Sequence, residues 1–208
     1  MKKYIFIIFL AVVLSACTPS EIEATKMPAA LPTSASDLTS EVESNVDILA
    51  NLPAATCESG LTPENQEGPY YKEGSPETLS LFTEGMQGTR LILAGMVLNQ
   101  DCLPIPNVWL DFWQTDSEGN YDNNGYVLRG HQYTDNKGRY YLETILPGQY
   151  SSRPIEHIHV KVEASSGKVL VTQLYFPEQP VDGLTVSLDD RGDYFLGYFN
   201  FVIQIDGN

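Results

Sequence analysis

Short runs of strand-forming residues separated by glycine and proline restrict the fold of this chain more than any other feature. Such runs occur at residues 91–98, 159–162 and 194–205, where aliphatic and aromatic residues predominate or alternate with polar ones. These residue types favour strands, and Gly and Pro mark the turns between strands. No long stretch has strong helical periodicity. The sequence therefore predicts an all-β domain, a β-sandwich of two mostly antiparallel sheets with the C-terminal run as its closing strand.

The N-terminus has the features of an export signal. Two lysines precede an apolar stretch over residues 4–14, which is too short to span a bilayer but suits the core of a signal peptide. The run Leu14-Ser15-Ala16-Cys17 that follows resembles the lipobox of bacterial lipoproteins, in which the cysteine is acylated and becomes the first mature residue. The alternative is an ordinary signal peptide with an incidental cysteine. We expect residues 1–16 to be a lipoprotein signal peptide and Cys17 to anchor an exported protein to a membrane of the cell envelope.

Residues 17–56 differ in composition from the rest of the chain. They are rich in Ser, Thr, Ala, Pro and Glu and contain no aromatic residue, so they bury too little apolar surface to fold alone. We expect a flexible, lipid-anchored tether. A weak helical pattern within it, enough for a short amphipathic segment, is formed by Leu38, Val42, Leu49 and Leu52. The remaining residues 57–208, about 150, suit one compact domain.

The chain has three cysteines. If Cys17 carries lipid, Cys57 and Cys102 are the only possible disulfide pair in an oxidising compartment. The alternative is two unrelated buried thiols.

Two of the three histidines lie two residues apart, at His157 and His159. Side chains alternate between the faces of a strand, so two imidazoles at this spacing point the same way and can bind one metal ion. A polar stripe on a solvated strand face is the alternative.

Tyr121 and Tyr150 are candidates to complete such a site. Phenolate is a hard oxygen ligand and imidazole a borderline nitrogen ligand, so two tyrosines with two histidines favour ferric iron over zinc or cuprous copper. The alternative is a packing role, because the chain has 12 tyrosines and spacing alone does not select these two.

A series of collinear motifs from about Cys57 to the C-terminus resembles the intradiol ring-cleavage dioxygenases, the family that includes catechol and protocatechuate dioxygenases. The matching stretches are residues 61–71, 103–107, 111–116, 119–121, 129–135, 138–140, 145–150, 157–159 and 172–176. Each motif is weak alone, and their shared order makes the resemblance specific. Residues 61–71 also resemble the entry segment of the exported single-domain members of the family.

The resemblance implies an activity, a cofactor and a ligand set. Non-haem Fe(III) would be held by Tyr121, Tyr150, His157 and His159, at loops and strand ends on one side of the sandwich. The substrates would be a small catechol-type aromatic diol and O2, and the product a muconate-type dicarboxylic acid opened between the hydroxylated carbons. The tyrosine at the position of Tyr150 is the ligand that substrate displaces, after which it can accept a catechol proton.

Two further catalytic residues follow from the resemblance. Arg153 matches the arginine that stabilises negative charge on the bound substrate, although it stands one residue farther from His157 than the family places it. An inserted residue, Ile155 or Glu156, explains the offset. Gln173 matches a position close to the iron.

The net charge of the chain indicates which partners and substrates it can bind. The formal net charge is −15, and loss of the signal peptide with its two lysines takes it to −17. Such acidity excludes nucleic acid and electrostatic binding to anionic lipid, and it favours a neutral catechol over protocatechuate.

A non-catalytic binding module is the second hypothesis. Residues 134–150 also fit a hairpin of a prealbumin-like β-sandwich on the cell envelope, in which Tyr150 is structural. Such a module needs neither the His-x-His pair nor Tyr121, so these residues distinguish the two hypotheses.

Overall fold

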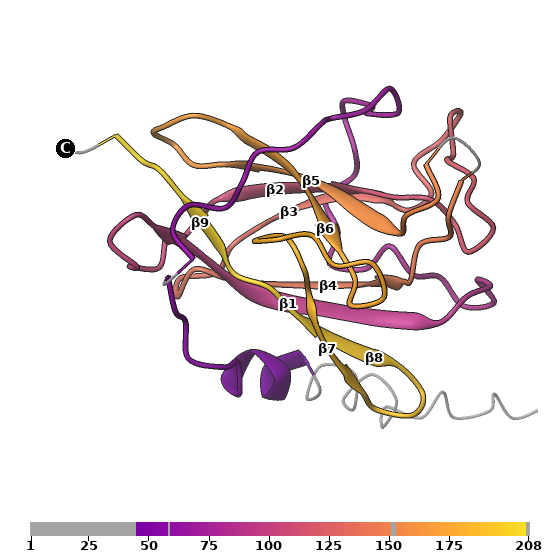
Figure 1. The fold of residues 1–208 in the computed structure, drawn as a ribbon, viewed down its shortest axis with the longest axis horizontal. Coiled ribbons are helices and arrows are strands. Elements are labelled where there is room, and N and C mark those ends of the chain that lie inside the picture. The colour runs from indigo at the N-terminus through magenta and orange to yellow at the C-terminus, as the bar shows by residue number, and fades with distance from the viewer. Residues whose placement is uncertain (1–44, 58, 151–152, 207–208) are drawn as a thin grey trace, which may run out of the picture. The chain divides into compact units, whose positions relative to one another are not determined.

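Nine strands in the described part of the chain form two sheets (Figure 1). The structure is a computed structural model and describes residues 45–57, 59–150 and 153–206. The strands are β1 (Arg90–Asn99), β2 (Trp109–Trp113), β3 (Arg129–Tyr133), β4 (Arg139–Ile145), β5 (His157–Glu163), β6 (Leu170–Tyr175), β7 (Ser187–Asp190), β8 (Phe195–Tyr198) and β9 (Phe201–Ile203). The predicted β-sandwich is confirmed.

One sheet has the order β4-β1-β8-β7, with β9 also paired to β1, and the other has the order β3-β2-β5-β6. The pairings of β1 with β8 and β9 are parallel, and the other named pairs are antiparallel. The expected single closing strand is two strands, β8 and β9. The strand is interrupted between β8 and β9, because the Asn200 side chain there accepts the hydrogen bond from the backbone N–H of Met96. A Cβ at Gly95 would stand only 1.8 Å from the Phe199 carbonyl oxygen, so a glycine is required there.

The core lies between the two sheets. Alternation along β2 and β5 turns Leu110, Phe112, Ile158 and Val160 inward, where all four are fully buried. The same alternation turns Asp111, His157 and His159 to the opposite, outer face of the four-stranded sheet. This outer face carries the candidate site.

A long irregular segment covers that outer face. We call residues 62–78 the covering segment. Its ends are held by backbone hydrogen bonds, from Thr62 to Val202 and from Thr78 to His131. Between them, Asn65 bonds the backbone of β6 at Val171.

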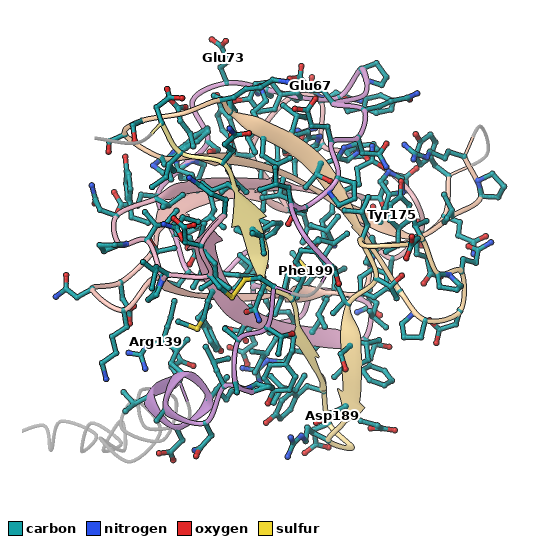
Figure 2. All side chains as sticks on the ribbon, turned by 60° about the vertical axis from the view of Figure 1, so that its left-hand side comes forward. Glu67, Glu73, Arg139, Tyr175, Asp189 and Phe199 are labelled. Atoms are coloured by element: carbon teal, nitrogen blue, oxygen red, sulfur yellow. A yellow bond between two sulfur atoms is a disulfide. The ribbon has the colours of Figure 1, made fainter. Side chains whose placement is uncertain are left out.

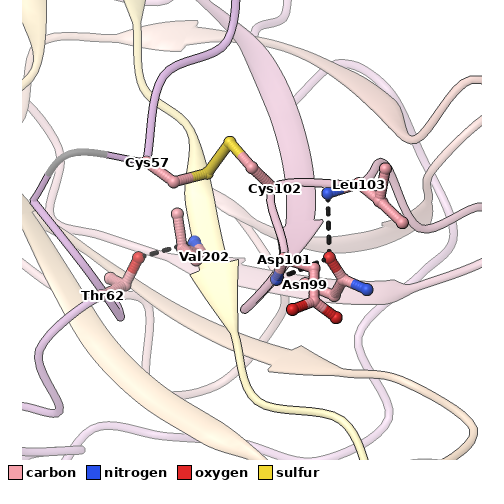
Figure 3. Close-up of a disulfide and its surroundings, with 7 residues drawn as sticks. All are labelled: Cys57, Thr62, Asn99, Asp101, Cys102, Leu103 and Val202. Carbon is pink, nitrogen blue, oxygen red and sulfur yellow. Dashed lines mark hydrogen bonds between the residues drawn. A yellow bond between two sulfur atoms is a disulfide. The ribbon is translucent and has the colours of Figure 1, made fainter.

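A disulfide fixes the chain just before the covering segment. Cys57 and Cys102 are bonded, with a Cα separation of 5.8 Å and a sequence separation of 45 (Figure 3). Cys102 lies in the turn after β1, where the Asn99 side chain accepts hydrogen bonds from the backbones of Asp101 and Leu103. The start of the domain is therefore attached covalently to the loop between β1 and β2.

The last part of the predicted tether contacts the five-stranded sheet. Residues 45–50 are helical, and Ile48 packs in a small cluster with Ile92 and Tyr141. Arg139 donates to the Leu49 carbonyl at 2.8 Å. No helix in residues 45–206 that the structure describes is long and apolar enough to cross a membrane. The predicted signal peptide, Cys17 and the tether up to residue 44 lie outside the described residues.

Candidate metal centre

The four predicted ligands come together on the outer face of the four-stranded sheet. His157 and His159 lie on β5, Tyr121 in the β2–β3 loop and Tyr150 in the β4–β5 loop. Their ring centroids are 4.8 Å apart for the two histidines, 5.8 Å for the two tyrosines, 5.9 Å for Tyr150 and His157, and 6.2 Å for Tyr121 and His159. Four aromatic side chains from three elements therefore surround one point.

The histidine geometry suits a shared cation. The two Nε2 atoms are 3.1 Å apart. His157 Nδ1 lies 2.7 Å from the Ile155 carbonyl oxygen, and a carbonyl only accepts, so Nδ1 carries the proton and Nε2 offers a lone pair. This contact fixes the ring in the orientation that a metal ligand requires.

Burial sets the protonation of the ligands. It lowers the pKa of His157 to about 4 and, together with repulsion from His157, lowers that of His159 to about 2. Both imidazoles are therefore neutral at physiological pH, which is the form that binds metals. Burial also raises the pKa of Tyr121, and its Oη is buried without a hydrogen-bond partner in the described part of the chain. A cation would supply the missing partner.

The Asp122 carboxylate holds the loop that carries Tyr121. Asp122 accepts hydrogen bonds from the backbones of Asn124, Gly125 and Val127, and these bonds lower its pKa to about 2. Gly119, at φ +85°, lets this loop approach the Tyr150 loop so closely that a Cβ would stand 2.1 Å from the Gln149 carbonyl oxygen.

Arg153 and Gln173 lie beside the ligands and are connected through Tyr175 (labelled in Figure 2). Arg153 Nη2 donates to Tyr175 Oη at 2.7 Å, and that hydroxyl donates to Gln173 Oε1 at 2.8 Å. Asn65 Nδ2 also donates to Tyr175 Oη, at 3.1 Å. In the β5–β6 register, Gln173 pairs with His159 and Tyr175 with His157. The spacing of Gln173 and Tyr175 matches that of the histidines, and this signal points to Tyr175, which we did not predict.

The residues at the predicted insertion form a tight turn. The Ile155 backbone donates to the Arg153 carbonyl at 2.8 Å, and the Ile155 carbonyl then contacts His157. Residues 151 and 152 lie outside the described residues.

The sequence did not predict the aromatic surroundings. Tyr70 stacks on Tyr121 with ring centroids 4.4 Å apart. Trp113 stacks on His159, with ring centroids 4.8 Å apart and the planes 8° apart. A Cβ on Gly68 would stand 3.2 Å from His159 Cε1. The covering segment therefore covers the site on the side that faces away from the sheet.

The donor set contains two hard oxygen donors as well as two imidazoles. No group of three or more His, Cys, Asp and Glu side chains gathers anywhere in the residues that the structure describes. Two imidazoles and two phenols are the donors present, and this mixture fits Fe(III).

Residues 66–185, more than half of the chain, match the family model described as Dioxygenase. The chain belongs to the intradiol dioxygenase family. Members of this family typically use non-haem Fe(III), which agrees with the donor set described above.

Characterised intradiol dioxygenases match the chain at moderate identity. The catechol 1,2-dioxygenase of Acinetobacter baylyi is 29% identical in an alignment 156 positions long that covers 61% of this chain and 50% of that protein. The protocatechuate 3,4-dioxygenase beta chain of Burkholderia cepacia is 32% identical in an alignment 112 positions long that covers 45% of this chain and 47% of that protein. The chain thus spans about half the length of the curated relatives it matches.

Solved intradiol dioxygenase structures share the fold. The dioxygenase domain of a dioxygenase carbohydrate-binding protein fusion from Streptomyces sp. SirexAA-E is 41% identical, with a TM-score of 0.68 over 70% of this chain and 99% of that one. The 3-chlorocatechol 1,2-dioxygenase of Rhodococcus opacus 1CP is 25% identical, with a TM-score of 0.64 over 80% of this chain and 77% of that one.

The N-terminus of this intradiol dioxygenase family member also matches a known signal. Residues 1–18 match the prokaryotic membrane lipoprotein lipid attachment site. The protein is an exported, membrane-anchored lipoprotein.

Proposed function

We propose that the protein is a non-haem Fe(III)-dependent dioxygenase that opens a catechol-type diol between its two hydroxylated carbons. The reaction adds both atoms of O2 to the diol and gives a muconate-type dicarboxylic acid. The observation that carries this proposal is the convergence of two neutral histidines and two tyrosines on one point of the outer sheet face.

Tyr121, Tyr150, His157 and His159 would hold the iron. Bound Fe(III) supplies Lewis acidity that activates the diol for reaction with O2. We assign Tyr150 as an iron ligand whose phenolate would also be the base that accepts one hydroxyl proton of the diol. The resemblance of residues 145–150 to the family motif supports this assignment.

Arg153 is the proposed electrostatic partner of the substrate. Its guanidinium is held by Tyr175, and Tyr175 is in turn held by Gln173 and Asn65. A fixed cation in a closed site stabilises charge that builds on the diol oxygens. We assign Gln173 the role of keeping this network in place.

We propose an uncharged catechol as the substrate rather than a catechol carboxylate. The nearby cations are already engaged: Arg129 donates to the Tyr70 and Asp122 carbonyls, and Lys161 contacts Glu67 and the Tyr71 ring. Arg153 is then needed for the diol itself, and the acidic surface repels anions. The similar proteins include both a catechol 1,2-dioxygenase and a protocatechuate 3,4-dioxygenase chain, so this choice rests on the charges around the site.

We also propose the division of the chain. Residues 1–16 would be the signal peptide, residues 17–56 the tether from a lipidated Cys17, and residues 57–208 the catalytic domain. A non-catalytic β-sandwich module, the alternative hypothesis, has no need of the buried histidine pair.

Isotope labelling tests the proposed reaction. Iron-loaded full-length protein should convert catechol under ¹⁸O2 to a ring-opened diacid that carries two labelled oxygens. His159→Ala is the control and should form no product. A product with one labelled oxygen, or an intact ring, would contradict intradiol cleavage.

A further inference from the structure

A second polar cluster lies one residue row away from the candidate metal centre. Asp111 on β2 pairs with His131 on β3 and with Lys161 on β5, on the same outer sheet face as the histidine ligands. Asp111 is only 2% exposed and Ser75, which covers it, only 5%. The role proposed for the metal centre uses none of these groups.

Both oxygens of the Asp111 carboxylate are bound by the covering segment. Ser75 Oγ donates to Oδ1 at 2.7 Å, and Tyr71 Oη donates to Oδ2 at 3.2 Å. The Ser75 hydroxyl has one proton and gives it to Asp111, so the His131 Nδ1 atom 3.1 Å away acts as donor to Ser75. One buried carboxylate thus attaches two points of the covering segment to the sheet.

Aromatic contacts connect this cluster to a proposed iron ligand. Tyr71 packs edge-on against Trp113, with ring centroids 4.9 Å apart, and Trp113 stacks on His159. Lys161 Nζ lies 3.3 Å from the centroid of the Tyr71 ring and bonds Glu67 at 2.7 Å. Figure 2 shows Glu67 and Glu73 on the same side of the molecule. Tyr71 therefore contacts Trp113, and Trp113 in turn contacts His159.

The carboxylate is expensive to bury. Burial raises the pKa of Asp111 although Ser75 and Tyr71 donate to it, so the ionised form is less well stabilised in the folded chain than in water. A buried charge of this kind is weak evidence for a stabilising role. The contacts by which Asp111 holds the covering segment in place explain its presence better.

We propose that Asp111 is a positioning residue, which fixes the covering segment over the candidate site through Tyr71 and Ser75 and thereby orients Trp113 against His159. The positioning itself does not depend on the proposed function. Its consequence for substrate binding does rest on that function.

Limited proteolysis of the metal-free full-length protein tests the positioning. Trypsin cleavage after Lys72 reports opening of the covering segment, and cleavage after Arg191 in the exposed β7–β8 turn, which bonds Asp189 outside that segment, reports changes elsewhere. Tyr71→Phe keeps the ring and removes only the hydroxyl. We expect it to speed cleavage after Lys72 by about tenfold or more, as for loss of a hydrogen bond to a charged group, and to leave cleavage after Arg191 unchanged.

A double-mutant cycle assigns the effect to Asp111. In an Asp111→Asn background, Tyr71→Phe should change cleavage after Lys72 much less, because the charged acceptor is gone. Tyr198→Phe on β8 is the matched control and should change neither site. Equal effects of Tyr71→Phe in both backgrounds, or parallel increases at Lys72 and Arg191, would overturn the proposal.

The iron-loaded protein gives a separate readout. Tyr71→Phe should raise KM for catechol by several-fold with little change in kcat, since the covering segment closes the site but donates no ligand. If no form of the protein turns over catechol, the proposed function fails while the proteolysis result still decides the positioning role. A fall in kcat with unchanged KM would contradict the proposed closure.

Discussion

Single side chains at the candidate centre owe their chemical state to burial. His157 and His159 are neutral because their desolvated rings resist protonation, and Tyr121 stays protonated until a cation reaches it. The sequence predicted these residue types as ligands. It did not predict Tyr70 and Trp113 as their stacking partners, because Tyr70 is 51 residues before Tyr121 in the chain and only the strand register brings Trp113 beside His159.

Replacement of Arg153 tests its electrostatic role. Arg153→Met should lower kcat by about 10²-fold, the usual effect of removing one group that stabilises developing charge, and should leave the iron content unchanged. Steady-state kinetics with metal analysis measures both quantities. Arg191→Met, at an exposed arginine, should change neither. Loss of iron in Arg153→Met would show that the arginine maintains the ligand set instead.

Asp111 makes stability depend on pH. Its pKa is raised by burial, so above the ordinary aspartate pKa of about 4 the folded chain holds the proton more tightly than the unfolded chain. The free energy of unfolding contributed by Asp111 is therefore lost as pH rises through the folded pKa. Asp111→Asn cannot ionise, and its stability relative to the parent should increase from pH 4 to pH 7 in urea titrations, roughly across that window. A difference that does not vary with pH would contradict the raised pKa.

At the scale of elements, two strands and three loops make the site. β5 supplies both histidines and β6 supplies Gln173 and Tyr175 in register with them. The strands were predictable from composition and alternation. The covering segment was quoted as a family motif, but its position over His159 depends on contacts between residues about 90 apart in sequence, which local patterns do not encode.

A pair of glycines tests the fit of the covering segment. Gly68 and Gly60 both have φ +74°, so alanine at either position costs a similar amount, about 1–2 kcal/mol for a left-handed conformation. Only Gly68 faces His159, because nothing lies within 4 Å of a Cβ built on Gly60.

We expect both alanine variants to lose similar stability and only Gly68→Ala to lose iron affinity, by about 10-fold or more, as for other changes next to a ligand. Thermal unfolding and iron titration measure the two effects. Equal iron affinity in the two variants would show that the covering segment does not pack tightly against His159.

At the scale of the whole molecule, a lipoprotein signal, a disulfide and a β-sandwich together describe a member of the intradiol dioxygenase family that is suited to the cell envelope. The fold class and the family were predictable from the sequence. The division of the last strand at Asn200 and the packing of Ile48 on the sheet were not, because each depends on tertiary contacts with residues far away in the sequence.

The disulfide should stabilise the domain. Replacement of both Cys57 and Cys102 by Ala should lower the free energy of unfolding by about 2–5 kcal/mol, since the 45-residue loop is then unconstrained in the unfolded chain. Urea unfolding measures the loss. Reduction of the parent protein is the matched control and should give the same urea midpoint as the double-alanine variant. If both midpoints equal that of the oxidised parent protein, the disulfide does not stabilise the domain.

The lipid anchor is tested by fractionation. Cys17→Ala should release the protein from the membrane fraction or leave it with an uncleaved signal peptide. Retention of a processed Cys17→Ala protein in the membrane fraction would place the anchor elsewhere.

The most direct test of the central claim is the visible spectrum of the iron-loaded full-length protein, recorded before and after anaerobic addition of catechol. Two phenolates on Fe(III) predict a red-brown charge-transfer band that shifts with catechol, weakens in Tyr150→Phe and is lost in His159→Ala. A colourless protein that takes up no ferric iron, or a band that persists unchanged in both variants, would contradict the proposed metal centre.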